Sequence, residues 1–148
     1  GKIGIRGEVG EARNTNFTYD EQITLMSLWC IFRSPLMFGG DLPQTDATTL
    51  SLITNKEALE LNQHSKNNRQ IYADEELIVW TADHENDSKH YIALFNIGET
   101  SLQQEKIASF LKDQLPALDV WNHKLIQKED ELTIAPHGAL LLVKYSTK

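Results

Sequence analysis

The chain has 148 residues, of which 41% are hydrophobic and 24% are charged, and its formal net charge is -7. This composition is typical of a soluble globular protein with one ordinary domain, or with one small domain and part of another. An acidic chain repels the phosphate backbone of nucleic acids, and no apolar run is long enough to span a bilayer. We therefore expect neither nucleic acid nor a membrane as a partner.

Residues 1–18 are polar and rich in glycine, which predicts a loop. Thr18 and Glu21 then form a capping-box pattern that predicts the start of a helix. The helix is expected to end near Arg33, because Ser34-Pro35 follows it. Its apolar residues cover more than one stripe, which indicates burial on several sides.

Residues 36–38 form a short continuous apolar run, which is typical of a strand buried on both faces of a parallel sheet. Thr45 or Asp46 can cap a second helix, and Asn55 can cap a third. A parallel strand needs neighbours for its amides and carbonyls, and a βα barrel needs eight such units and about 250 residues. We therefore interpret residues 1–66 as the last helix-strand-helix remnant of a (β/α)8 TIM barrel, and we expect that upstream chain is missing.

From about Arg69 the apolar pattern changes to a period of two. Short alternating runs separated by turn residues predict an antiparallel β-sandwich over residues 67–148, so the fold class is mainly β. The alternation places Trp80, Ile92 and Leu94 in the core of the sandwich, together with Leu141. The expected strands are 76–81, 89–96, 119–121, 131–134 and 139–143.

The side chains offer little chemistry of their own. The single cysteine, Cys30, lies in an apolar run and is predicted to be a buried, inert thiol. The histidines have no metal-ligand spacing, so we expect no metal and no cofactor. Three carboxylate-rich stretches resemble a glycosidase pair but are predicted to be solvated turns, because none has the apolar surroundings that keep a carboxyl neutral. These stretches are 74–76, 83–87 and 129–131.

Residues 21–42 read EQITLMSLWCIFRSPLMFGGDL. This block resembles the region from the seventh helix through the eighth strand of α-galactosidases and α-N-acetylgalactosaminidases, where a helix ending in Leu-Trp precedes Ser/Ala-Pro-Leu and then Asp-Leu. Residues 52–63 are similar to the eighth-helix block of that family, which leads into an Asn-Gln pair. Residues 79–80, 93–96 and 136–141 are similar to strands of the family's C-terminal sandwich.

The resemblance implies a retaining mechanism, in which one aspartate attacks the anomeric carbon and a second acts as acid and base. In the family, both aspartates and the principal sugar contacts precede the region that this chain resembles, so no catalytic residue is assigned in this chain. The implied function is that of a C-terminal fragment of a hydrolase of terminal α-galactosides or related α-glycosides. The fragment alone is expected to be inactive, its sandwich is expected to support the barrel, and the family suggests a secreted or periplasmic location.

Two residues are candidates for the periphery of a substrate site. Asp41 follows the predicted strand, and active sites of such barrels lie at the C-terminal ends of strands. Arg13 lies with Arg6 and Glu8 in the long loop that would share this face. Each has a plainer alternative, which is capping for Asp41 and a solvated surface charge for Arg13.

A second class of function remains open, which is a carbohydrate-binding sandwich without hydrolytic activity. Such a module needs exposed aromatic rings, and Trp121 is the best candidate because it lies beside a turn.

The first helix also carries more apolar surface than a monomer exposes, with Leu28, Trp29 and Phe32 among its residues. We expect this surface to pack on the sandwich or to cause self-association of the truncated chain.

Overall fold

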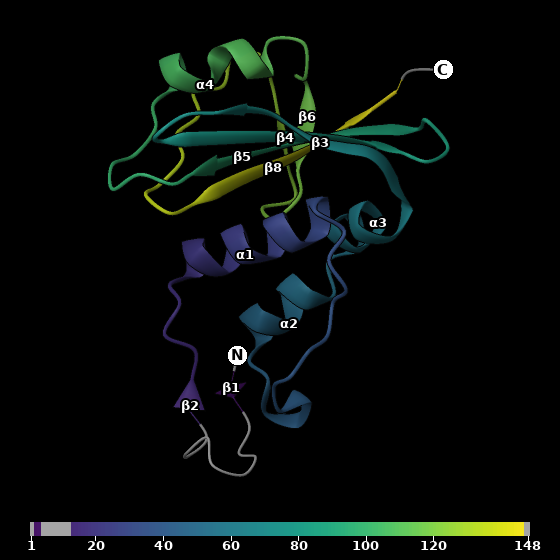
Figure 1. Cartoon of the computed structure of the whole chain (residues 1–148), viewed down its shortest axis with the longest axis vertical. Coiled ribbons are helices and arrows are strands. Elements are labelled where there is room, and N and C mark those ends of the chain that lie inside the picture. Colours follow the sequence, from purple (N-terminus) through teal and green to yellow (C-terminus); the bar gives the residue numbers. More distant parts are fainter. Residues whose placement is uncertain (1, 4–12, 147–148) are drawn as a thin grey trace.

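The computed structural model describes residues 2–3 and 13–146 (Figure 1). A helical part, residues 13–64, is followed by a sheet part, residues 65–146, which carries one further helix on the face away from the helical part. The elements in chain order are β1 (Lys2–Ile3), β2 (Arg13–Asn14), α1 (Tyr19–Ile31), η2 (Leu42–Gln44), α2 (Ala47–Ile53), α3 (Lys56–His64), β3 (Ser65–Ala73), β4 (Leu77–His84), β5 (Lys89–Asn96), α4 (Gln104–Leu111), β6 (Ala117–Asp119), β7 (Lys124–Ile126) and β8 (Ala139–Tyr145).

The predicted helix starts are confirmed by their caps. At α1 the Thr18 amide donates to Glu21 Oε2 at 2.7 Å, and the Glu21 amide donates to Thr18 Oγ1 at 3.3 Å, which completes the capping box. Asp46 caps α2 and Asn55 caps α3, each through a side-chain oxygen that accepts a backbone amide of the first turn. Local chemistry in the sequence therefore determines where these helices begin.

The strand predicted at residues 36–38 is not formed. This segment is extended chain without strand pairing, and it leads from the end of α1 to the short 3-10 helix η2. A segment without a neighbouring strand gains no backbone hydrogen bonds of a sheet, so an apolar sequence alone does not form a strand. The prediction is wrong for the secondary structure of these residues.

The sheet part has six strands in the order β3-β4-β5-β8-β6-β7, and every neighbouring pair is antiparallel. Two expected strands differ from the structure. The first is β6, which ends at Asp119 because this carboxylate accepts the amides of Trp121 and Asn122 and turns the chain. The second is residues 131–134, where Ile134 makes a single bridge to Leu102 instead of a strand.

Two apolar clusters lie on opposite faces of the central strands. On β5, Tyr91 and Ala93 belong to the first cluster, which α1 and α3 cover, while Ile92 and Leu94 belong to the second, which α4 covers (Figure 1). The second cluster also takes residues from β6 and β7, which do not neighbour β4 or β5, so the sheet folds over this cluster as a sandwich does.

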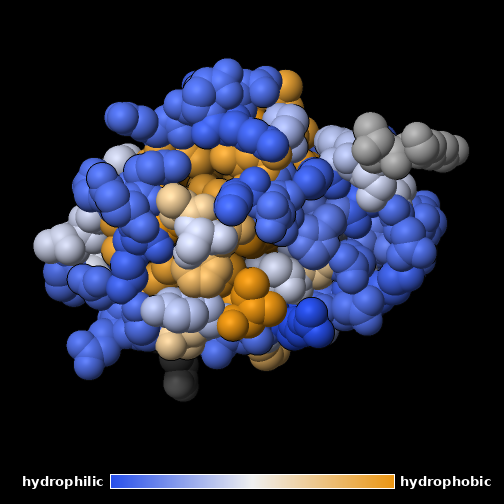
Figure 2. All heavy atoms as spheres, turned by 90° about the horizontal axis from the view of Figure 1, so that it is seen from above, coloured by the Kyte–Doolittle hydropathy of each residue, from blue (hydrophilic) through white to orange (hydrophobic). Residues whose placement is uncertain are grey.

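The core predicted from the alternation is largely confirmed. Ile92, Leu94 and Leu141 are buried, whereas Trp80 is half-buried and its ring lies 5.2 Å from that of Phe32. Helix α4 was not expected from the sequence pattern. Figure 2, viewed from above, shows hydrophilic residues around the edge of this face and hydrophobic residues in its middle.

The helical part is buried on one side only. Cys30 and Ile31 are fully buried against the sheet, as was predicted for the thiol, but Trp29 is 39% exposed and Met37 is 88% exposed. A groove of about 270 Å³ between α1, α2 and residues 37–40 is lined mainly by apolar side chains. Packing on the sandwich was one of the two outcomes expected for α1, and it accounts for the sheet-facing side.

Candidate functional site

Asp41 and Arg13, the two peripheral candidates, lie at the end of the helical part away from the sheet. Asp41 starts η2, and its Oδ2 accepts Gln44 Nε2 at 2.6 Å. Arg13 is exposed and opposes Ile3 in the pairing of β2 with β1. Among the described residues, no hydrogen bond or ion pair joins Asp41 to Arg13. Arg6 and Glu8 lie outside the described residues.

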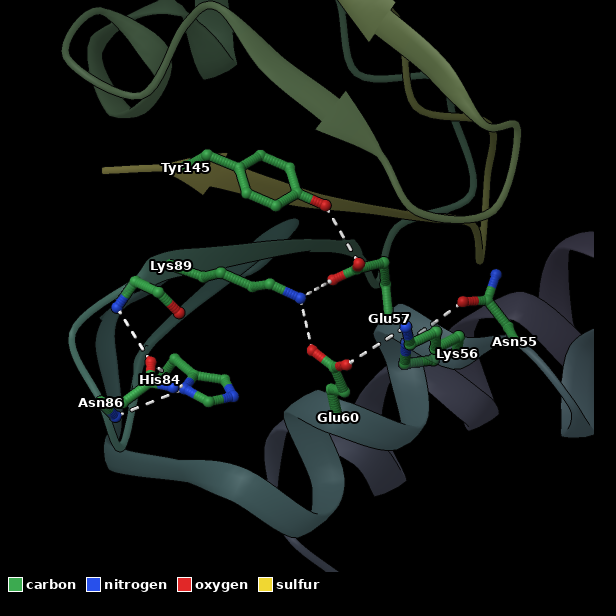
Figure 3. Close-up of polar contacts among 10 residues, drawn as sticks. Asn55, Lys56, Glu57, Glu60, His84, Asn86, Lys89 and Tyr145 are labelled. Atoms are coloured by element: carbon green, nitrogen blue, oxygen red, sulfur yellow. Dashed lines mark hydrogen bonds and ion pairs between the residues drawn. The ribbon is translucent and has the colours of Figure 1, made fainter. Parts of the chain in front are cut away.

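A more elaborate polar site lies at the junction between the helical and sheet parts (Figure 3). Lys89, the first residue of β5, donates from Nζ to Glu57 Oε2 at 2.8 Å and also to Glu60 Oε2. The Tyr145 hydroxyl on β8 donates to Glu57 Oε1 at 3.0 Å. We call Lys89, Glu57, Glu60 and Tyr145 the junction cluster. Its lysine side chain is only 12% exposed.

The local sequence explains how the junction cluster forms. Glu57 and Glu60 are three residues apart on α3, which places both carboxylates on one helix face. The cap residue Asn55 also points toward the sheet part, because its Nδ2 donates to the Val120 carbonyl at 2.7 Å. The first turns of α3 are therefore attached to the sheet by a neutral hydrogen bond and by charged ones.

The charges of the junction cluster stabilise one another. Burial disfavours the charged form of Lys89, but the hydrogen bonds that its ammonium donates to Glu57 and Glu60 outweigh this effect, so the pKa of Lys89 lies above its ordinary value. The hydrogen bond from Lys89 lowers the pKa of Glu60. Burial raises the pKa of the neighbouring Tyr91, whose hydroxyl has no hydrogen-bond partner among the described residues.

This arrangement is not a glycosidase acid and base pair. A general acid must be a carboxyl kept neutral near pH 7, and a nucleophile or base must face free space for substrate. In the junction cluster both carboxylates are bound by the same ammonium group. The cluster can hold the helical part on the sheet, and its geometry offers no position for a reacting sugar.

The carboxylate-rich turn that contains Asp74 has contacts of a structural kind. Asp74, in one of the carboxylate-rich turns, accepts Lys106 Nζ at 2.6 Å and the Leu77 amide at 2.7 Å, and these contacts hold its pKa well below the ordinary value. No group of His, Cys, Asp and Glu side chains within residues 13–146 is arranged to hold a metal ion. The same stretch has no helix long and apolar enough to cross a membrane.

Trp121 contradicts the expectation of an exposed aromatic ring. It is 7% exposed, and its Nε1 donates to Ser27 Oγ of α1 at 2.8 Å. The predicted turn beside it is present, but α1 packs over that turn and buries the ring. A feature of tertiary packing therefore overrides a local signal.

Family comparisons cover both parts of the chain. The model of the α-galactosidase C-terminal β-sandwich domain matches residues 74–143, and the model of α-galactosidase A matches residues 10–64. The chain belongs to the α-galactosidase family of glycoside hydrolases. It represents the C-terminal portion of that family, as its sequence resemblance indicated.

Relatives in this family are similar along most of the chain. Alpha-galactosidase 2 of Arabidopsis thaliana is 26% identical over 86% of the chain and 34% of its own length. Among solved structures, a candidate α-N-acetylgalactosaminidase of Bacillus halodurans has a TM-score of 0.83 and 36% identity, over 99% of this chain and 37% of its own. A β-L-arabinopyranosidase of Geobacillus stearothermophilus has a TM-score of 0.76 and 38% identity, over 99% of this chain and 35% of its own.

The chain thus spans about a third of the length of these relatives. The structural likeness extends over both the helical and the sheet part, so their joint arrangement is that of the family's C-terminal portion. The sequence interpretation missed the junction cluster. The one signal for it was the pair of glutamates three residues apart on a predicted helix, which has no meaning until Lys89 is known to face them.

Proposed function

We propose that the chain is the C-terminal part of a retaining glycoside hydrolase that acts on terminal α-galactosides or related α-glycosides. The catalytic aspartates belong to upstream chain, and the sandwich supports the barrel. One observation carries this proposal, which is that matches to the α-galactosidase family cover both the helical and the sheet part.

The junction cluster supports the structural half of the proposal. It ties α3, which we place at the end of the barrel, to β5 and β8 of the sandwich. We propose residues 1–66 and 67–148 as the two domains. The apolar groove beside Trp29 and Phe38 is then a surface that the rest of the barrel covers.

The substrate class is a galactose-like pyranoside. The structural relatives named above are a candidate α-N-acetylgalactosaminidase and a β-L-arabinopyranosidase. A β-L-arabinopyranoside has the ring configuration of an α-D-galactopyranoside and lacks its hydroxymethyl group, so one site shape suits both. We propose Asp41 and Arg13 as peripheral contacts of this site, on the face where barrel strands end.

Hydrolysis assays test the proposal. The purified chain is expected to give no turnover of aryl α-galactoside, α-N-acetylgalactosaminide or β-L-arabinopyranoside. The longer polypeptide from the same reading frame is expected to hydrolyse at least one of them with retention of anomeric configuration. Turnover by the chain alone, abolished by replacing one of its own carboxylates, would contradict the proposal.

The alternative is a sugar-binding sandwich without hydrolytic activity, and the buried Trp121 weighs against it. Titration calorimetry with galactose and the purified chain is expected to give no binding heat. Produced alone, the chain is expected to self-associate through the apolar groove, which light scattering reports as a mass above 16.8 kDa.

A further inference from the structure

Helix α1 ends in an unusual way. The Ser34 amide donates to the Trp29 carbonyl at 2.9 Å and the Arg33 amide donates to the Cys30 carbonyl at 3.1 Å, which is the hydrogen-bond pattern of a Schellman motif. The residue in the left-handed conformation of this motif is usually glycine. Here it is Arg33, with φ of 57°, a conformation that a side chain disfavours.

The hydrogen bonds of the Arg33 side chain explain why an arginine occupies this position. Its Nε donates to the Asn62 carbonyl at 3.2 Å, Nη1 to the Ser65 carbonyl at 2.6 Å, and Nη2 to the Gln63 carbonyl at 3.1 Å. The last carbonyls of a helix lack partners within it and carry partial negative charge. A planar guanidinium reaches three of these acceptors at once, which a lysine ammonium on its flexible stem does not reproduce.

The attachment is reciprocal. Asn62 on α3 donates from Nδ2 to the Ser34 carbonyl at 2.9 Å and to the Trp29 carbonyl at 3.3 Å. Asn68 donates from Nδ2 to the Ile31 carbonyl at 2.8 Å. The C-terminal ends of α1 and α3 therefore cap each other, and both the amide and the carbonyl of Ser34 are held.

Segment 34–41 leaves from this mutual cap. It is extended, it contains the highly exposed Met37, and it ends at Asp41, where η2 begins. Leu36 packs against the first cluster and Gly40 makes a single β-bridge, so the segment is held at these points and at the mutual cap. The mutual cap sets the direction in which the chain leaves Arg33 toward Asp41.

We propose that Arg33 is a positioning residue, whose three hydrogen bonds to the end of α3 fix the course of segment 34–41 and thereby place Asp41. The consequence for catalysis rests on the proposed function, in which Asp41 borders the substrate site. The hold on the segment itself does not depend on that function, so the two are tested by different measurements.

The test uses Arg33→Lys in the longer polypeptide, with Arg69→Lys, an exposed arginine of β3, as the matched control. Hydrogen exchange followed by mass spectrometry is expected to show faster exchange in segment 34–41 of the Arg33 variant and no change in the control. Because small displacements near a reacting centre reduce rates strongly, kcat/KM is expected to fall roughly tenfold, with the thermal midpoint changing far less than for a core substitution.

Asn62→Ala, which removes the reciprocal bonds to Trp29 and Ser34, is the second variant if Arg33→Lys does not fold, and the same exchange change is expected. Unchanged exchange in segment 34–41 overturns the proposal. Faster exchange with unchanged kcat/KM overturns the placement of Asp41 as a contribution to catalysis. If the wild-type polypeptide hydrolyses none of the pyranosides, the proposed function fails, and the exchange result alone decides whether Arg33 holds the segment.

Discussion

The helical and sheet parts bury their apolar residues in different ways. The central strand β5 is buried on both faces over Tyr91, Ile92, Ala93, Leu94 and Phe95. Helix α1 buries Cys30 and Ile31 completely, but Trp29 is 39% exposed, and Phe32, the residue after the helix, is 58% exposed. The sheet part is thus a complete core, whereas the helical part has one face on that core and one face that no other described residues cover. The comparison shows that a segment can have well-formed caps and still depend on its neighbours for burial.

The largest expected effect measures this difference directly. Leu94→Ala in β5 removes a fully buried side chain and is expected to lower the free energy of unfolding by about 2–5 kcal/mol. Leu50→Ala in α2, where Leu50 is 48% exposed, is expected to lower it by less than about 1 kcal/mol. Urea unfolding of both variants gives the two values. Equal losses would show that the outer face of the helices is buried in solution.

A smaller effect is expected at the junction cluster. Lys89→Met leaves the carboxylates of Glu57 and Glu60 partly buried without their cation, which we expect to lower the free energy of unfolding by about 2–3 kcal/mol, somewhat below the range for fully buried pairs. Lys56→Met is the control, because Lys56 is 86% exposed and lies 4.0 Å from Glu60. Its expected change is less than about 0.5 kcal/mol. If the two variants unfold alike, the cluster does not attach the helices to the sheet.

The smallest effect concerns the pH dependence of α2. The Thr49 amide and hydroxyl donate to Asp46 and lower its pKa from 3.8 to about 2. A carboxyl whose pKa is depressed by folding stabilises the folded state above its unfolded pKa, and this contribution is lost as the pH falls through the folded pKa.

Asp46→Asn keeps a capping oxygen but removes the charge. The variant is expected to lose less helical circular dichroism than the wild type between pH 3.8 and about 2. The control is Asp113→Asn, at an exposed aspartate of the sheet part, and it is expected to lose helical circular dichroism over this pH range as the wild type does. A wild-type acid response in Asp46→Asn would show that the cap does not control the pH response of α2.

Features that depend on residues close together in the sequence could be predicted, and features that depend on distant residues could not. The caps depend on residues three positions away, and the predictions of Thr18 and Asn55 were correct, while for the second helix the structure selects Asp46 from the two predicted candidates, Thr45 and Asp46. The alternating pattern of β4 and β5 likewise gives both strands and most of the core. The family assignment came from the block at residues 21–42, which preserves a long run of family residues.

The failures involve partners that are distant in the chain. Residues 36–38 have the composition of a strand but lack a neighbouring strand, and Trp121 lies beside a turn but is covered by Ser27 of α1. The junction cluster joins residues 29 and 88 positions apart in its pairs Glu60–Lys89 and Glu57–Tyr145. No local pattern encodes such a pairing, because each side chain alone has the appearance of an ordinary polar residue of the surface.

The single cysteine gives this chain a built-in reporter of separation between its two parts. Cys30 is 0% exposed in the cluster shared by α1 and the sheet, and burial raises the pKa of its thiol to about 12. A thiol reagent requires the thiolate and access to it, so it reacts only with molecules in which α1 has lifted from the sheet. The rate at which the thiol is modified, measured at increasing denaturant concentration, therefore reports how often α1 separates from the sheet. Comparing this rate with the global unfolding transition shows whether the helices leave the sheet before the sheet itself unfolds.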